Sequence, residues 1–265
     1  MLKYFQIYKT SIKQERDTVV DTLLRAVSFF IIIFIFVQLW SFIYGEGGTS
    51  SVINGYSLQQ MIWYLITTEL IQYTARNRLI MNSISNEIKS GSIAYKLNRP
   101  YNFYLYNITT FMGKSTWMLL FMLPVAIIMG FCFVGSVSSF TWWQILPNIL
   151  TLLLANLLIW VMYAIMGLLC FWIEDASPFS WILQKFLMLL GLFFPVEFFP
   201  AWMQPIIEYS PIYSVFSGPA KLVANFSWEL FLKVFASQAF WCAILICVGI
   251  GLYNLGKRRV NVNGG

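Results

Sequence analysis

Histidine is absent from this chain, and charged residues are scarce in it. Only 11% of its 265 residues are charged, whereas soluble domains carry about 25%. Without histidine the chain lacks the commonest general base and the commonest metal ligand, which argues against an enzyme. Because 59% of the residues are hydrophobic, we expect one integral membrane domain over residues 1–265.

Cysteine is also rare, and its positions argue against a metal site. All four cysteines lie within apolar runs, where a thiol behaves as a small hydrophobic group. No two of them have the spacing of a metal site. These residues are Cys132, Cys170, Cys242 and Cys247. We therefore expect no cofactor in this chain.

Long uncharged runs predict membrane-spanning helices. A helix needs about 20 apolar residues to cross the hydrocarbon core of a bilayer. Three runs meet this requirement without a charge, a fourth is longer than a crossing requires, and two weaker runs carry Glu69 or Lys185. The expected spans are Ala26–Tyr44, Ser57–Ala75, Ser115–Val137, the later part of Trp142–Ile173, Ser180 to about Pro200, and Val234–Gly256. The sequence thus predicts an all-α integral membrane protein with six transmembrane helices.

The positive charges predict how these spans are oriented, because short cytoplasmic loops collect Lys and Arg. If both termini are cytoplasmic, the inner segments hold 14 of the 17 Lys and Arg residues and the outer segments hold two. We therefore expect a multi-pass protein of the inner (plasma) membrane with both termini in the cytoplasm. The net charge of +6 then reflects an inner rim that faces anionic lipid, and we expect no nucleic-acid partner.

Residues 1–25 precede the first run and predict an amphipathic helix at the membrane interface. Apolar residues recur there at helical spacing, with polar residues on the opposite face. The apolar positions are Met1, Tyr4, Phe5, Tyr8 and Ile12. Leu2 and Ile7 fall outside this face, which leaves a frayed basic tail as the alternative. The length and mixed charge of the segment disfavour a signal peptide.

Glu69 is a charge inside a predicted span, and such charges tend to be functional. Gln72 and other polar residues lie close to it, so this span is too polar to face lipid all round. One interpretation places Glu69 and Gln72 on a transport path, with Glu197 as a third candidate. The other makes Glu69 an interhelical hydrogen-bonding group or the ion-pair partner of Arg76 or Lys185.

Five prolines interrupt residues 191–219, and no continuous helix survives such spacing. The segment is nonetheless rich in Phe, Trp, Ile and Tyr. Non-helical backbone at membrane depth must be covered by protein or line a water-filled cavity. We therefore expect short re-entrant helices on the outer side over residues 195–233. A loop that lies on the lipid headgroups is the alternative.

Residues 76–114 form the long loop on the predicted cytoplasmic side. Asn82 or Ser83 can begin a short helix in it, and Gly91 can end that helix. Apolar residues then alternate with polar ones until Arg99-Pro100 stops the segment. The alternating residues are Ile93, Tyr95 and Leu97. Exposed apolar and basic groups predict a docking surface here, and a solvated basic linker is the alternative.

Two local motifs have simpler explanations than function. The run "GKST" at Gly113–Thr116 resembles the end of a phosphate-binding loop, but the glycine that such a loop requires is Ile108 here. We therefore expect no nucleotide binding by this chain.

The second motif is acidic. Glu174 and Asp175 precede Ser177-Pro178, where Ser177 can cap a helix and acids suit the helix dipole.

The chain resembles the ABC-type-2 transporter permeases over its whole length. The resemblance rests on the amphipathic N-terminus and on three motifs, which are "EIKSGSIAYKLNRP", "FWIEDASP" and "FFPVEFFPAWMQPIIEYSPIY". It implies a six-span subunit that pairs with a second permease, the same or paralogous. It also implies two copies of a separate ATP-binding-cassette subunit, which bind ATP and Mg and hydrolyse the nucleotide. No catalytic residue is then expected in this chain.

The same resemblance implies that the loop between the second and third spans holds a coupling helix that fits a groove of the ATPase. Seven residues are expected to make this contact, namely Glu87, Ile88, Gly91, Ile93, Leu97, Arg99 and Pro100. We expect Glu87 and Arg99 to supply polar contacts and Gly91 to set the turn.

An export permease without its own ATPase explains these features best. An importer permease should carry a Glu-Ala-Ala loop, and "NEIKSGSIAYKLNRP" lacks the paired alanines. An ATP-independent channel or secondary carrier is the alternative, although carriers often show internal repeats that are not evident here. With 11 Trp and 24 Phe, the chain is suited to a hydrophobic or amphipathic substrate, but lipid-facing surfaces use the same residues.

Overall fold

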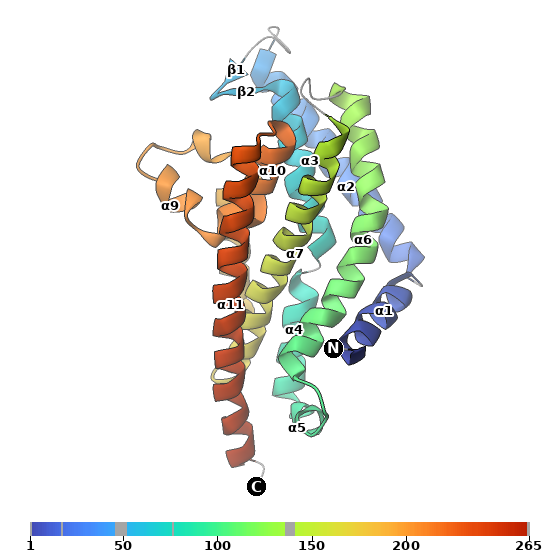
Figure 1. Ribbon diagram of the computed structural model, residues 1–265, viewed down its shortest axis with the longest axis vertical. Helices are drawn as coiled ribbons and strands as arrows, with labels where there is room; N and C mark the ends of the chain where they lie inside the picture. The colour runs from blue at the N-terminus through green and yellow to red at the C-terminus, as the bar shows by residue number, and fades with distance from the viewer. Residues whose placement is uncertain (1, 17, 46–51, 76, 136–140, 264–265) are drawn as a thin grey trace.

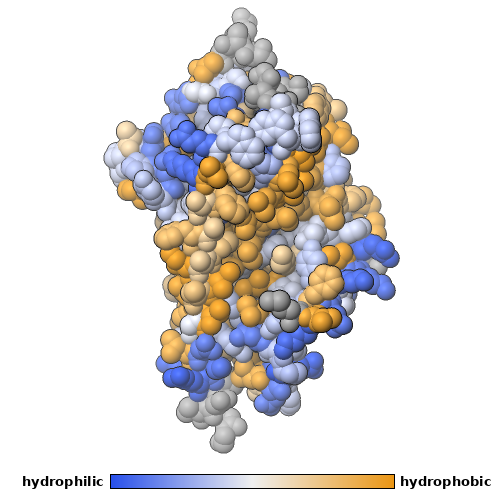
Figure 2. All heavy atoms as spheres, viewed as in Figure 1, coloured by the Kyte–Doolittle hydropathy of each residue, from blue (hydrophilic) through white to orange (hydrophobic). Residues whose placement is uncertain are grey.

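Long helices run side by side along the molecule in the computed structural model (Figure 1). The structure describes residues 2–16, 18–45, 52–75, 77–135 and 141–263. Within these residues, four helical segments are long and apolar enough to cross a membrane. They are α2 (Val19–Tyr44), α6 (Phe103–Val134), α7 (Ile145–Leu168) with its flanking turns η2 (Trp142–Gln144) and η3 (Leu169–Phe171), and α11 (Trp228–Asn263). An apolar band crosses the middle of the surface in Figure 2, and hydrophilic residues gather at both ends. This pattern is that of a multi-pass membrane protein.

Helix α3 (Leu58–Ala75) lies among these helices and is shielded from the surroundings by them. It packs against α2, α6 and α7, and Met61, Tyr64 and Ile71 on it are fully buried. The helix carries Glu69 and several Thr and Gln residues, which lower its hydropathy below that of the four apolar segments. A helix of this kind is stable inside a bundle because its neighbours cover its polar groups.

The predicted fifth span is shorter than a membrane crossing. Helix α8 (Ser177–Leu187) continues as the π-helical turn η4 (Met188–Leu192), and the two together hold 16 residues. A crossing needs about 20 residues, and this helical segment ends at Leu192, three residues before Pro195. The prediction of six spans is therefore not confirmed, because four apolar segments are accompanied by the less apolar α3 and the short α8–η4 segment.

Helix α1 (Leu2–Arg16) lies against α6, in the half of the molecule that also holds α4, α5 and the end of α11 (Figure 1). Helix was predicted there, but it ends at Arg16, and the residues from Val19 onward belong to α2. Within the chain, Phe5 of the predicted apolar face is 65% exposed and Ile7, which lies outside that face, is half-buried. A position of α1 at the membrane interface stays a prediction. Contact with α6, and not with lipid alone, decides which side of α1 is covered.

Gly113 allows α1 and α6 to approach closely. A Cβ atom at Gly113 would lie 2.6 Å from the backbone oxygen of Tyr8 and 2.8 Å from Cβ of Ser11. Ser11 and Glu15 of α1 are buried in this contact region. The glycine of "GKST" therefore serves helix packing.

Helix α6 begins well before Ser115, where the third span was predicted to start. The side-chain oxygen of Asn102 accepts hydrogen bonds from the backbone N–H groups of Tyr104 and Leu105, at 3.0 and 3.2 Å, and so caps the helix at Phe103. Polar residues in its first turns bond to their own helix, as Thr109 does with the Leu105 carbonyl at 2.8 Å. The predicted loop over 76–114 therefore ends at Asn102 and consists mainly of α4 (Asn77–Lys89) and α5 (Ile93–Leu97).

The proline-rich segment is broken into short turns, as its prolines require. In chain order they are η5 (Val196–Phe198), α9 (Gln204–Glu208), the π-helical η6 (Tyr213–Ser217) and α10 (Gly218–Ala224). Helix α11 starts at Trp228, before the predicted Val234. Re-entry of these turns into the membrane over residues 195–233 is not confirmed by the structure and stays a prediction.

A small β-hairpin stands at the opposite end of the molecule from α5 (Figure 1). Strand β1 (Val52–Ile53) pairs antiparallel with β2 (Tyr56–Ser57). Asn54 and Gly55 join the strands with φ angles of 49° and 86°, which suits the left-handed turn of a two-residue hairpin. The all-α prediction missed this element, although an Asn-Gly pair is its usual signal.

Candidate functional site

At the hairpin end, a polar cluster joins the start of α3 to the proline-rich segment. The Tyr56 hydroxyl donates to Oε2 of Glu197 at 3.1 Å, and Lys221 of α10 pairs with the other oxygen of Glu197. The Tyr44 hydroxyl donates to the Tyr56 carbonyl at 2.7 Å, and Nζ of Lys221 lies 5.9 Å from the centre of the Tyr213 ring. The cluster ties α2, β2, η5 and α10 together. Glu197, predicted to line a path, is thus held in a network of structural contacts.

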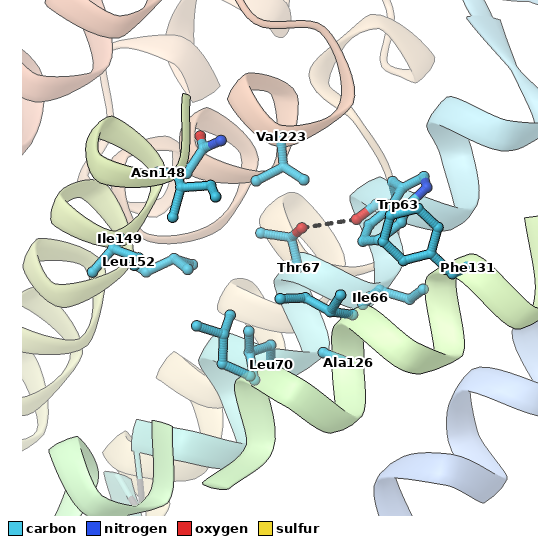
Figure 3. Close-up of a pocket in the computed structure, with 13 residues that line it drawn as sticks. Trp63, Ile66, Thr67, Leu70, Ala126, Phe131, Asn148, Ile149, Leu152 and Val223 are labelled. Carbon is cyan, nitrogen blue, oxygen red and sulfur yellow. Dashed lines mark hydrogen bonds between the residues drawn. The ribbon is translucent and has the colours of Figure 1, made fainter. Parts of the chain in front are cut away.

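A cavity of about 290 Å³ lies between α3, α6, α7 and α10 (Figure 3). Its walls are almost entirely apolar, with Leu70, Leu152 and Val223 facing the space from three of these helices. The Thr67 hydroxyl is occupied, because it donates to the backbone carbonyl of Trp63 at 2.8 Å. This central cavity suits an apolar group.

One polar atom of the central cavity is left over. The side-chain oxygen of Asn148 is buried and has no hydrogen-bond partner among the described residues. Buried acceptors without partners are rare in folded proteins. Among the described residues that line the cavity, Asn148 is therefore the one with an unsatisfied buried polar atom.

A second pocket, of about 430 Å³, lies between α2, α3 and the α8–η4 segment, and we call it the Glu69 pocket. Gln72 lines it together with Glu69, so the structure brings two of the three predicted path residues together, while Glu197 lies elsewhere. Lys185 is not the partner of Glu69, because its Nζ atom lies over the Trp181 ring, 5.4 Å from the ring centre. Arg76, the other predicted partner, lies outside the described residues.

Helices α4 and α5 form a helix–turn–helix unit at the end of the molecule opposite the hairpin (Figure 1). Gly91 makes the turn with φ +71°, as the sequence predicted, because the left-handed region favours glycine. Glu87 organises the turn, since its carboxylate pairs with Lys96 and its backbone oxygen accepts from the Ser92 hydroxyl at 3.3 Å. Asn82 and Ser83 lie inside α4 and do not begin it, so this part of the prediction was wrong.

The coupling residues differ in how much of each side chain faces outward. Ile93 is fully buried, and Ile88 and Leu97 are half-buried against the core. Tyr95 is 81% exposed. Residues 93–97 are helical, so the alternation in this stretch did not mark an extended segment, and Ile93 is an internal anchor that no partner can contact.

Arg99 and Pro100 are exposed just beyond α5. The Pro100 carbonyl accepts a hydrogen bond from the Lys3 ammonium group, and the backbone N–H of Asn102 donates to the Tyr4 hydroxyl at 3.1 Å. The start of α1 therefore holds the turn between α5 and α6.

Asp175 links the end of α4 to the start of α8. Its Oδ1 atom accepts hydrogen bonds from Nζ of Lys89 at 2.9 Å and from the hydroxyl and backbone N–H of Ser177 at 2.8 and 3.2 Å. These bonds, the one from Lys89 first, lower the pKa of Asp175 to about 2, and the bond to Asp175 raises the pKa of Lys89. Asp175, and not the predicted Ser177, supplies the capping oxygen of α8. Nothing in the sequence pattern indicated the contact with Lys89.

A sequence model of the ABC-2 family transporter proteins matches residues 20–264, from the second residue of α2 to just beyond the end of α11. The chain belongs to the ABC-2 transporter family. Proteins of the ABC-2 family are membrane permease subunits that are not themselves catalytic and work with an ATPase partner. The resemblance found in the sequence motifs is thereby confirmed. No curated protein is significantly similar to the chain in sequence.

Proposed function

We propose that this ABC-2 permease is the membrane subunit of an ATP-driven exporter, which carries a hydrophobic or amphipathic substrate out of the cell. In this proposal the chain lies in the inner (plasma) membrane, with both termini and the α4–α5 unit in the cytoplasm. ATP and Mg bind to the separate ATPase subunits, which dock on the α4–α5 unit. Family membership supports the permease role, and the basic residues of this end support the orientation.

The connections of the α4–α5 unit are the observation that carries the proposal. Helix α4 packs against α7 and is tied to the start of α8 by Lys89 and Asp175. The turn after α5 is tied to α1 by Lys3 and Tyr4 and leads directly into α6. A force applied to this unit would therefore reach α1, α6, α7 and α8 together, as coupling to an ATPase requires.

The exposed face of this unit defines the expected contact with the ATPase. Tyr95 and Arg99 supply an exposed aromatic ring and a guanidinium group, a pair of residue types that is enriched at interface hot spots. Pro100 follows them on the same exposed turn. Glu87, Ile88 and Leu97 then shape the unit from within, Gly91 makes its exposed turn, and Ile93 anchors it to the bundle.

A second permease, identical or paralogous, completes the proposed transporter, with two ATPase subunits beneath it. Only 22% of the apolar window of α2 and of α11 is buried within one chain, so these helices offer surface to lipid or to a partner. The α3 helix and the α8–η4 segment would lie near the shared path, because the Glu69 pocket opens between them and α2.

Reconstitution tests this function and separates it from the alternative of an ATP-independent channel or carrier. The permease is co-expressed with an ABC-type ATPase subunit from the same organism and inserted into proteoliposomes, and uptake of a panel of hydrophobic and amphipathic compounds is measured with and without ATP. We expect transport only with both subunits and ATP. Transport by the permease alone at the same rate would support the channel or carrier instead.

A further inference from the structure

We propose that the Glu69 pocket binds a lipophilic organic cation, with the Glu69 carboxylate as its counter-ion. The inference rests on the proposed transport function only where it takes this ligand to be the substrate. The binding itself follows from the residues of the pocket.

The first observation is the isolation of a buried acid. Glu69 is 3% exposed and lines the pocket, yet its carboxylate has no hydrogen-bond or ion-pair partner within the residues that the structure describes. An ionised carboxylate without a partner is costly to keep away from water. A cation that enters the pocket would remove this cost, whereas an anion would increase it.

The second observation concerns the positive charges near the pocket. Arg25 lines it, but its Nε atom is bonded to Oδ2 of Asp21 at 3.1 Å, one turn away on α2. Arg78 is also near, with an Nη2 atom that donates to the side-chain oxygen of Gln184 at 2.5 Å. The charge of Arg25 is thus balanced within α2, while that of Glu69 is not balanced by any described group.

The third observation is the distribution of polar and apolar residues along the pocket. Arg25 lies near the start of α2 and Phe36 lies 11 residues further along it, which corresponds to about 16 Å of helix. Phe36 and Phe193 form an apolar end with ring centres 5.7 Å apart. A pocket with a carboxylate and aromatic rings suits an organic cation, because ring faces attract cations as well as apolar groups.

Size and backbone geometry agree with a ligand site. The volume of about 430 Å³ lies within the range of about 300–1,000 Å³ that is common for small-molecule sites. Met188 and Leu192 line the pocket from the two ends of the π-helical turn η4. Single π-helical turns occur frequently at functional sites.

Two probes of nearly the same shape and opposite charge test the proposal. Tetraphenylphosphonium is a lipophilic cation and tetraphenylborate is the matching anion. Their binding to the purified permease in lipid nanodiscs is measured by equilibrium dialysis. We expect tighter binding of the cation, and a loss of at least about tenfold in its affinity in Glu69→Gln, because this change removes the buried counter-charge. Binding of the anion should not fall.

Three further variants make the test specific. Glu69→Asp keeps the charge and should keep the preference for the cation. Gln72→Lys places a cation one helical turn from Glu69 in the same pocket and should abolish cation binding by a different route. Glu208→Gln is the matched control, since Glu208 pairs with Lys233 at 3.2 Å in the proline-rich segment, outside this pocket. It should bind the cation as the wild type does.

Equal affinities of the wild type for the two probes, or unchanged cation binding in both Glu69→Gln and Gln72→Lys, would overturn the inference. Failure of this inference is distinguishable from failure of the proposed function. If the permease carried out ATP-driven transport of other compounds but did not bind the cation, the pocket proposal would be refuted and the exporter proposal would stand. Glu69-dependent cation binding in a permease that does not respond to its ATPase would sustain the pocket and refute the exporter.

Discussion

Nζ of Lys89, the last residue of α4, lies 2.9 Å from Oδ1 of Asp175, which precedes α8. The two residues are 86 positions apart in the sequence. Their ion pair joins the unit proposed to meet the ATPase to the segment that lines the Glu69 pocket.

Substitution of Lys89 and Asp175 tests whether their ion pair transmits coupling. We expect Asp175→Asn and Lys89→Gln each to reduce substrate-stimulated ATPase activity of the reconstituted complex, and the double exchange Lys89→Asp with Asp175→Lys to restore part of it. The pair should not respond to pH near neutrality. The pKa of Asp175 is lowered to about 2, so its contribution is lost only as the pH falls towards that value, and the pKa of Lys89 is raised, so its charge persists into the alkaline range. Equal activity of all variants would show that the ion pair transmits no coupling.

The close contact of α1 and α6 predicts a strong effect at Gly113. In Gly113→Ala the new methyl group would meet the Tyr8 backbone at 2.6 Å, and we expect a loss of about 1–3 kcal/mol in the free energy of unfolding from overpacking. Gly251→Ala in α11 is the matched control, because a Cβ atom there has nothing within 4 Å. That variant should be as stable as the wild type or slightly more stable. Thermal unfolding in detergent measures both, and equal midpoints would contradict the packing role of Gly113.

Ile93 and Tyr95 should separate stability from docking. Ile93 is fully buried and Tyr95 is 81% exposed. Ile93→Ala should cost about 2–5 kcal/mol of stability, as is usual for large-to-small changes in a core. Tyr95→Ala should leave stability unchanged and weaken capture of the ATPase in a pull-down assay. Wild-type capture by Tyr95→Ala together with Arg99→Ala would place the docking surface elsewhere.

The turn at Gly91 predicts a graded series of variants. Its φ of +71° lies in the left-handed region, and a Cβ atom there would meet nothing within 4 Å, so any penalty comes from the backbone alone. We expect Gly91→Val to destabilise the turn by about 1–2 kcal/mol or more, and Gly91→Asn by less, because Asn tolerates this region better. Limited proteolysis between α4 and α5 measures the opening of the turn. Identical cleavage rates in the three proteins would contradict this account.

Single-cysteine labelling in intact cells tests the orientation. In a cysteine-free background, a membrane-impermeant thiol reagent should label position 208 and should not label position 96. These positions lie in opposite halves of the molecule, in α9 and α5 (Figure 1). Labelling of position 96 alone would invert the proposed topology.

Sequence reasoning found the elements that depend on local composition. Long apolar runs located α2, α6, α7 and α11, and the glycine at position 91 marked a left-handed turn, because each feature has a signal within a few residues. Helix limits were less predictable. Asn102 caps α6 by accepting two backbone hydrogen bonds, and polar residues such as Thr109 form hydrogen bonds within the helix. The sequence shows only that these residues are polar, and for that reason a loop was predicted there.

Features that depend on contacts between distant residues could not be predicted. Lys89 pairs with Asp175, and Glu197 pairs with Lys221. Each ion pair joins segments that are distant in sequence, and no periodicity of the sequence reveals that they lie close together in space. Ile93 was expected on the surface because apolar and polar residues alternate around it, yet a short helix places Ile93 inward and Tyr95 outward equally well. The polar residues of α3 did indicate a protected helix, and two of them, Glu69 and Gln72, share a pocket.

The length of α6 gives it a mechanical role. Its 32 residues form one continuous helix, about 48 Å long at 1.5 Å per residue and so longer than the ~30 Å hydrocarbon core. The surplus extends the helix to the turn that follows α5, where a small sideways displacement would be passed into α6. Pro124 lies inside this helix, and proline removes a backbone hydrogen bond and weakens the rod locally. A displacement of the helix start at Phe103 would then move the part before Pro124 as a rigid segment and bend the helix at Pro124. Leu123 and Ala126, on either side of Pro124, line the central cavity, so the bend would change the wall of this cavity.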